Sequence, residues 1–233
     1  MELSKQQNAS QKNLSFIIAQ NLGQLILKET YLSDSILPSE LELSQQFNAS
    51  RTAIREAIKI LAAKGMVLAR PRIGTRVMPS SNWNFLDQDL LRWWINSEEQ
   101  SVVIKHFQVV RLAIEPHACY LAALNATKEQ KQSLQLLANE MLALSQAFDK
   151  QQWVKVDYRF HLTIYHACCN PFLVSFANLF RSVYQLYFDT IAENGAIEVN
   201  IHQQLADAII NGDSTQALDL CYKLLTTVNK THL

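Results

Sequence analysis

Apolar residues recur at helical spacing along most of the chain and predict a mostly α-helical protein. The first third has this pattern over 14–29, 40–47 and 51–64, and the last of these places Ile54, Ile58 and Leu61 on one face. Further helical patterns cover, in chain order, 100–124, 128–148, 151–168, 172–193, 198–211 and 214–229. Because the intervals between the later patterns are short, we expect antiparallel neighbours packed as a bundle.

One segment departs from the helical pattern. Within Met66–Met78, two short apolar runs flank Arg72-Ile73-Gly74 and predict a small β-hairpin. The predicted fold is therefore mostly α: three helices and a hairpin, followed by an all-α antiparallel bundle. The corresponding division is a polar tail at 1–12, a first domain at 13–78, a linker at 79–84 and a second domain at 85–233.

Helix start and stop signals sharpen the first domain. Ser39 is a candidate N-cap with Glu42 three residues later, which is the spacing of a capping box. Ser50 is a candidate N-cap of the next helix, and Gly65 is placed to end it. The sequence thus predicts two short helices joined by the tight turn of residues 48–50.

Composition indicates a folded, intracellular protein. Hydrophobic residues make up 48% and charged residues 18% of the 233 positions, which excludes a disordered chain. No apolar run reaches the roughly 18 residues of a membrane span, and the polar start lacks a secretory signal. The four cysteines are scattered, as in a reducing compartment. We therefore expect a cytoplasmic protein without a membrane partner.

The formal net charge of zero hides an asymmetry. Residues 1–80 hold ten basic and six acidic residues, a net of +4, so the remainder carries −4. Within 51–76, seven basic residues stand against the single acid Glu56. This distribution predicts a DNA-facing first domain and a second domain with another task. Charge alone also fits a solvated helix face.

The basic residues lie where a helix-turn-helix protein contacts DNA. Arg51 and Arg55 share an exposed face, and each guanidinium suits bidentate hydrogen bonds to guanine. Ser50 and Thr52 suit phosphate contacts or adaptable base contacts.

The predicted hairpin would add a wing to this motif. Arg70, Arg72 and Arg76 surround its tip, and Gly74 there would let the backbone approach DNA closely. The alternative is a helical unit that does not contact DNA.

In the second domain, one carboxylate and two imidazoles have the chemistry of a metal site. Asp157 and His161 are four residues apart on one helix face, and His202 opens a later helix. Together they could hold a divalent transition metal. A hydrogen bond within the helix is the plainer interpretation of the Asp157–His161 spacing.

The first domain resembles the winged helix-turn-helix of GntR-type bacterial regulators over about residues 13–78. The likeness rests on three separated elements, namely Leu37-Pro-Ser-Glu, Ser50-Arg-Thr-Ala-Ile-Arg-Glu-Ala-Ile and Gly74-Thr-Arg-Val. It implies DNA contacts by Ser50, Arg51, Thr52, Arg55 and the wing. Leu41 stands where several relatives have a basic DNA-contacting residue, so the operator sequence is expected to differ from theirs.

The second domain resembles the ligand-sensing domain of the FadR subfamily over about residues 85–230. The matching motifs are Val110-Arg-Leu-Ala-Ile-Glu-Pro, Asp157-Tyr-Arg-Phe-His, Asn170-Pro and the segment from His202 to Asp213. Members usually bind a metal such as Zn, Mn or Ni through one Asp and three His, with an organic acid beside it.

Carried over by position, the ligands are Asp157, His161 and His202, while the expected last histidine is replaced by Leu224. Either the metal binds more weakly, or effector oxygens complete its shell, or no metal binds. Arg111 is the expected partner of the effector carboxylate, with Arg181 as a second candidate. A surface Arg111 paired with Glu115 is the alternative.

Within this subfamily, Asn82-Trp-Asn-Phe-Leu-Asp and the missing last histidine resemble repressors that respond to sugar acids. The resemblance implies a homodimeric repressor that leaves a near-palindromic double-stranded operator when an aldonate-type acid binds. An activator or dual regulator that responds to another carboxylate is an alternative, and a metal-dependent enzyme is a remote one. A sensor of fatty acyl groups is disfavoured by the polar candidates.

Overall fold

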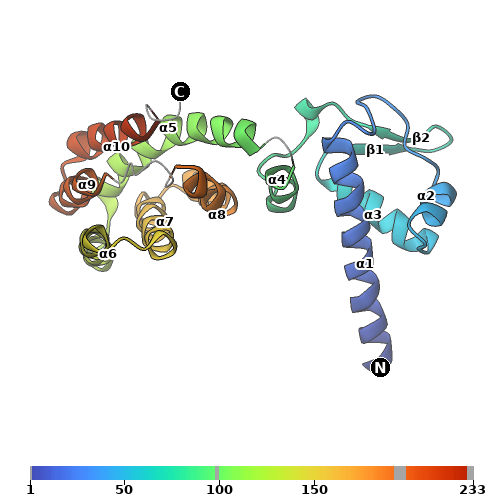
Figure 1. Ribbon diagram of the computed structural model, residues 1–233, viewed down its shortest axis with the longest axis horizontal. Coiled ribbons are helices and arrows are strands. Elements are labelled where there is room, and N and C mark those ends of the chain that lie inside the picture. The colour runs from blue at the N-terminus through green and yellow to red at the C-terminus, as the bar shows by residue number, and fades with distance from the viewer. Residues whose placement is uncertain (1, 98–99, 192–197, 230–233) are drawn as a thin grey trace. The chain divides into compact units, whose positions relative to one another are not determined.

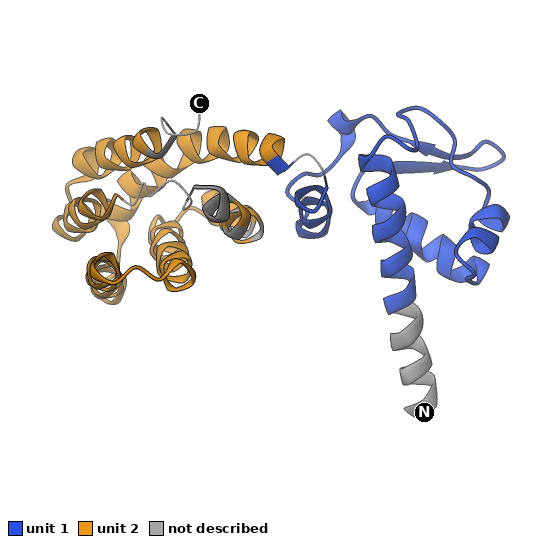
Figure 2. Cartoon of the chain, viewed as in Figure 1, with its two compact units in different colours: residues 1–100 blue, residues 101–233 orange. Residues whose placement is uncertain are grey.

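The computed structural model describes residues 2–97, 100–191 and 198–229, with side chains from residue 13 onward except in parts of 171–191 and at the end of the chain. The chain forms two compact units, residues 1–100 and 101–233 (Figure 2). Helices dominate both, and a two-stranded sheet lies in the first (Figure 1). No helix among the described residues combines the length and apolar character needed to cross a membrane. The predicted mostly α fold is confirmed.

Unit 1 begins with helices α1 (Glu2–Leu27), α2 (Glu40–Gln46) and α3 (Arg51–Ala63). The predicted capping box of α2 is present: the amide of Glu42 donates to Ser39 Oγ at 3.3 Å, and Glu42 Oε2 accepts from the amide of Ser39 at 2.7 Å. Ser50 caps α3 by accepting from the amide of Ala53 at 3.2 Å. Helix α1 starts earlier than expected, so the segment predicted as a polar tail at 1–12 is helical from Glu2; it contains no Gly or Pro that would stop a helix.

The hairpin is formed by β1 (Val67–Arg70) and β2 (Gly74–Val77), which pair antiparallel with Val67 opposite Val77. Gly65 makes the sharp exit from α3 with φ +76°, and a Cβ atom there would collide with the carbonyl oxygen of Asn82. The hairpin predicted within Met66–Met78 is therefore confirmed.

The division between the units differs from the linker expected at 79–84. A 3₁₀ turn, η1 (Ser80–Asn82), is followed by helix α4 (Gln88–Ile95), which belongs to unit 1 rather than to the second domain. Leu90 and Trp93 of α4 lie in the same apolar core as α1 and α3. A Cβ atom at Gly23 would lie 2.7 Å from the Trp93 ring, so the glycine lets this ring reach α1.

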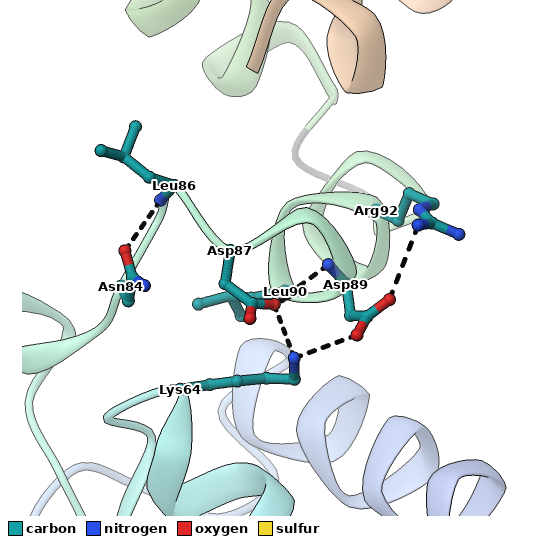
Figure 3. Close-up of polar contacts among 7 residues, drawn as sticks. All are labelled: Lys64, Asn84, Leu86, Asp87, Asp89, Leu90 and Arg92. Atoms are coloured by element: carbon teal, nitrogen blue, oxygen red, sulfur yellow. Dashed lines mark hydrogen bonds and ion pairs between the residues drawn. The ribbon is translucent and has the colours of Figure 1, made fainter. Parts of the chain in front are cut away.

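A buried lysine fixes α4 to the end of α3 (Figure 3). Lys64, 4% exposed, places its Nζ 2.6 Å from Asp87 Oδ1 and 3.2 Å from Asp89 Oδ2. Asp87 is also the N-cap of α4, and its Oδ1 accepts from the amides of Asp89 and Leu90, each at 3.0 Å. One carboxylate thus neutralises the lysine and starts the helix.

Unit 2 is all-helical, and its described helices follow the predicted spans to within a few residues. They are α5 (Gln100–Asn125), α6 (Lys128–Gln146), α7 (Lys150–Ala167), α8 (Pro171–Ile191), α9 (Val199–Asn211) and α10 (Ser214–Asn229). Helix α6 packs on α7 and α9, α7 packs on α8, and α9 packs on α10. Among the side chains that the structure describes, the bundle core is apolar apart from Arg111, Glu115, Asp157, His161 and His202, which lie together.

Candidate functional site

Unit 1 presents the predicted DNA-contacting residues of α3 on its exposed face. Ser50, Arg51, Thr52 and Arg55 are all exposed, whereas Ala53, Ile54 and Ile58 on the opposite face are buried. The Ser50 Oγ accepts the capping bond, and its O–H remains a donor. Among the described residues, Arg51 has no ion pair or side-chain hydrogen bond.

The hairpin exposes the remaining predicted contacts. Arg70 and Arg72 are exposed, and Gly74 has φ +109°. Arg72 lies in the turn with φ +64°, a left-handed conformation. The positive charge of Arg76 is partly compensated, because one guanidinium nitrogen lies 3.7 Å from Asp34 Oδ1.

Arg55 is paired in a way that the sequence did not indicate. Its Nε donates to Glu40 Oε1 at 3.2 Å and its Nη2 donates to Glu40 Oε2 at 2.9 Å. The hydrogen bond from Arg55 is the largest influence on Glu40 and lowers the pKa of this carboxyl. Glu40 opens α2 and is 15 positions from Arg55, so only the packing of α2 on α3 brings the two together.

In unit 2, the structure brings the predicted metal ligands together. Asp157 and His161 on α7 and His202 on α9 are buried, and their candidate ligand atoms all lie within 4.8 Å of one another. Asp157 Oδ1 lies 2.9 Å from His202 Nε2 but 3.8 Å from His161 Nε2. The second distance is too long for the intrahelical hydrogen bond considered as the alternative.

In both imidazoles, Nδ1 contacts an acceptor and Nε2 points toward Asp157. Nδ1 of His202 lies 2.8 Å from the carbonyl oxygen of Glu198, and Nδ1 of His161 lies 3.2 Å from Glu115 Oε2. Assigned from these partners, one proton of each ring sits on Nδ1, and Nε2 of each ring faces Asp157. Backbone or carboxylate acceptors at the far nitrogen are the usual support of metal-binding histidines.

This arrangement fits a cation. A lone pair of His202 Nε2 and the Asp157 carboxylate repel each other at 2.9 Å unless a positive charge or an additional proton lies between them. Nε2 of His202 is buried and accepts no hydrogen bond from any described residue. Burial tends to raise the pKa of Asp157, but His161, His202 and Arg111 outweigh it, so the pKa is lowered and the carboxylate is the stable form.

Arg111 is beside this cluster and is buried rather than exposed. Its Nε and Nη2 donate to the two oxygens of Glu115 at 2.7 and 3.1 Å. Burial tends to raise the pKa of Glu115, but the charge of Arg111 and the contact with His161 outweigh it and lower the pKa. Arg111 was expected to hold an effector carboxylate, but its Nε–Nη2 edge binds a carboxylate of the chain itself.

Glu115 is the residue whose role the sequence missed. It was considered only as a surface partner of Arg111, four positions away, but it also accepts from His161 and so joins the arginine to the ligand cluster. The sequence did indicate that Glu115 shares a helix face with Arg111, since it lies four residues later on α5.

Other candidates lie outside the cluster. Arg181 on α8 is exposed, and so are His117 and His166. Tyr184 is buried, with Arg111 Cζ 6.0 Å from its ring centroid. Leu224, in place of the last expected histidine, is buried on α10.

Comparison with known proteins agrees with both units. Residues 15–77 match the model for bacterial regulatory proteins of the gntR family, and residues 107–227 match the FCD domain. The chain is 53% identical to the HTH-type transcriptional regulator YieP of Escherichia coli K12, over 99% of this chain and all of that protein. It is 30% identical to the galactonate operon transcriptional repressor of the same strain, over 84% of this chain and 86% of that protein.

Two solved structures show the same fold. A GntR protein of Streptococcus agalactiae superposes with a TM-score of 0.53 at 22% identity, over 93% of this chain and 99% of that one. Lar of Listeria monocytogenes superposes with a TM-score of 0.56 at 17% identity, over 93% and 94%. With the two matched domains and the close relatives, the chain belongs to the GntR family: it is a DNA-binding transcriptional regulator with a C-terminal FCD domain, and not an enzyme.

Proposed function

We propose that this regulator represses a sugar-acid catabolic operon and is released from its operator by an aldonate-type acid. The observation that carries the effector assignment is the buried cluster of Asp157, His161 and His202 beside the Arg111–Glu115 pair. Buried charges and imidazoles are costly unless they are paired or bind a ligand. The printed name of the relative that represses the galactonate operon supports a sugar acid.

Asp157, His161 and His202 would hold a divalent metal such as Zn, Mn or Ni. When bound, the metal would supply a positive centre for carboxylate and hydroxyl oxygens. Three protein ligands leave coordination positions for an effector, and the replacement of the fourth expected ligand by Leu224 supports an effector that completes the shell.

The Arg111–Glu115 pair is neutral as a unit, so the bound metal would supply most of the attraction for an anionic effector, while the contact of Glu115 with His161 keeps this imidazole oriented. Arg181 is the second candidate for the effector carboxylate, and its exposure favours a lesser role. These assignments predict that an acid binds more tightly than the corresponding neutral sugar.

The DNA-binding half of the proposal uses α3 as the recognition helix, with Ser50, Arg51, Thr52 and Arg55 at the operator and Arg70, Arg72 and Gly74 on the wing. A homodimer would read a near-palindromic site in the cytoplasm. One face of α5 carries an exposed apolar stripe, which supports self-association. The stripe consists of Val102, Val109, Tyr120 and Leu124.

Effector release follows from linkage. An effector that prefers the conformer with low DNA affinity must itself bind less tightly to the DNA complex, by the same factor. A preference of about 3 kcal/mol would change operator affinity roughly a hundredfold, which is sufficient for induction.

The test is a thermal-shift series on metal-stripped protein, with Zn, Mn or Ni and a panel of aldonates, uronates and matched neutral sugars. A ligand at about 100 times its Kd stabilises by about 2.7 kcal/mol, which is easily measured. We expect one acid to raise Tm only with metal, and we expect His202→Ala to lose the effect. His166→Ala, an exposed histidine on α7, is the matched control. No shift with any acid would refute the sugar-acid assignment.

A further inference from the structure

We propose that Glu40 is a positioning residue for sequence recognition: by binding one edge of Arg55, it makes this arginine a reader of a specific base rather than a general phosphate contact. The inference rests on α3 being the recognition helix, as proposed above. The observation is the bidentate contact between Arg55 and Glu40, which joins the two helices of the helix-turn-helix.

The geometry assigns different tasks to the two edges of the guanidinium. Glu40 binds the side edge, formed by Nε and Nη2, at 3.2 and 2.9 Å. The other edge contains Nη1, and the Arg55 side chain remains 62% exposed. A planar group held on one edge has a fixed orientation, so a base that meets the second edge is recognised with less loss of side-chain entropy.

The frame that holds Glu40 is itself rigid. Glu40 follows the capping box of Ser39, and Arg55 lies one turn into α3 after the Ser50 cap. Buried Leu43 packs in the core with α3, so the distance between the two helices is fixed. An acidic side chain is also favoured in the first turn of α2 by the helix dipole.

Arg55 and Arg51 differ in how far an acidic partner compensates their positive charge. The Glu40–Arg55 pair is neutral as a unit, so Arg55 adds little to the sequence-independent attraction of DNA, which depends on uncompensated positive charge. Arg51 makes no ion pair in the described part of the chain, although its charge also helps to lower the pKa of Glu40, so Arg51 is the less compensated of the two arginines. What Arg55 can add is directional: a bidentate contact with guanine O6 and N7.

Substitution of Glu40 should change two measurable quantities in opposite directions: the affinity for any duplex and the preference for one base pair. Removing the charge of Glu40 leaves the Arg55 guanidinium mobile and its positive charge uncompensated, which strengthens binding to any duplex. The same change removes the orientation of Arg55, which weakens discrimination at one base pair of each half-site. A merely structural role for Glu40 would lower both quantities together.

The experiment selects full-length protein on a randomised duplex library and also measures binding to one mixed-sequence duplex that lacks the selected site. For Glu40→Gln we expect the preference at one base pair to fall about tenfold, while binding to the mixed-sequence duplex becomes tighter. Arg55→Lys keeps the charge without the planar group and should lose the preference at the same base pair. Glu56→Gln is the matched control, because Glu56 pairs with Lys59, 2.7 Å away on α3, and its removal should leave every base preference unchanged.

The results distinguish this inference from the proposed function. Selection of no sequence by the wild type would overturn operator binding through α3. Selection by the wild type with the same preferences in Glu40→Gln overturns the role of Glu40, as does a uniform loss across all bases in Arg55→Lys. If Glu40→Gln has a lowered Tm, Glu40→Asp serves instead: it keeps the charge but shortens the side chain, and it should lose the same base preference.

Discussion

Replacing Asp87 by Ala removes two interactions at once, because this carboxylate both caps α4 and neutralises buried Lys64. Loss of an N-cap costs about 1 kcal/mol. Removing one partner of a buried ion pair costs about 3–5 kcal/mol. Here Asp89 remains 3.2 Å from the lysine and the Asp87 side chain is 28% exposed, which reduces that second cost to about 1–2 kcal/mol. We therefore expect the free energy of unfolding of unit 1 to fall by about 2–3 kcal/mol.

The contribution of Asp87 should depend on pH. Burial tends to raise its pKa, but the hydrogen bond from Lys64 and those from the amides of Leu90 and Asp89 outweigh it, so the pKa is lowered in the folded state. A carboxyl with a lowered pKa stabilises the fold above its unfolded pKa, which is about 4, and this stabilisation disappears as pH falls through the folded value. The difference between wild type and Asp87→Ala should accordingly be full at pH 7 and shrink below pH 4.

Urea unfolding of the full chain, followed by tryptophan fluorescence, measures this effect, because buried Trp93 lies beside Lys64 with Nζ 5.2 Å from its ring centroid. For a unit of about 100 residues, the expected loss lowers Tm by about 10–20 °C. Asp89→Ala is the comparison, since it removes a longer contact and no cap, and should cost about 1 kcal/mol or less. Equal losses for the two variants, or a loss below about 0.5 kcal/mol for Asp87→Ala, would refute this account of α4.

Three further substitutions test other parts of the fold. Gly65→Ala combines φ +76° with a collision at the Asn82 carbonyl and should lower the free energy of unfolding by about 2 kcal/mol or more, by calorimetry; an unchanged Tm would contradict the turn. Ser50→Ala should cost about 1 kcal/mol in urea through loss of the α3 cap, whereas a neutral result would contradict that cap. Glu115→Gln leaves buried Arg111 without its counter-charge and should cost about 3 kcal/mol in the same assay, and a loss near zero would show that the pair is dispensable.

Local signals in the sequence were sufficient for the elements. The capping box of Ser39 and Glu42, the Ser50 cap and the turn at Gly65 each depend on residues within a few positions of one another, and all appear as predicted. Helical periodicity likewise located the bundle helices, because burial of one face repeats every 3.6 residues regardless of what the face packs against.

The candidate metal ligands were also accessible from the sequence, but their surroundings were not. Motif resemblance identified Asp157, His161 and His202, and the structure places them together. That Asp157 lies closer to His202 than to its helical neighbour His161 depends on the packing of α7 and α9 in the bundle. Such distances are absent from the spacing of residues along the chain.

Tertiary structure alone decided which polar groups pair across elements. Lys64 meets Asp87 over 23 positions and Arg55 meets Glu40 over 15, and these contacts assign α4 to unit 1 and orient one arginine of α3. Caps, turns and periodicity depend on residues that are neighbours in the chain. The sequence therefore determined the helices, the hairpin and the list of candidate binding residues. The direction of a side chain and the identity of its charged partner depend on how the helices pack, because burial of the apolar faces sets which charged side chains lie within ion-pair distance.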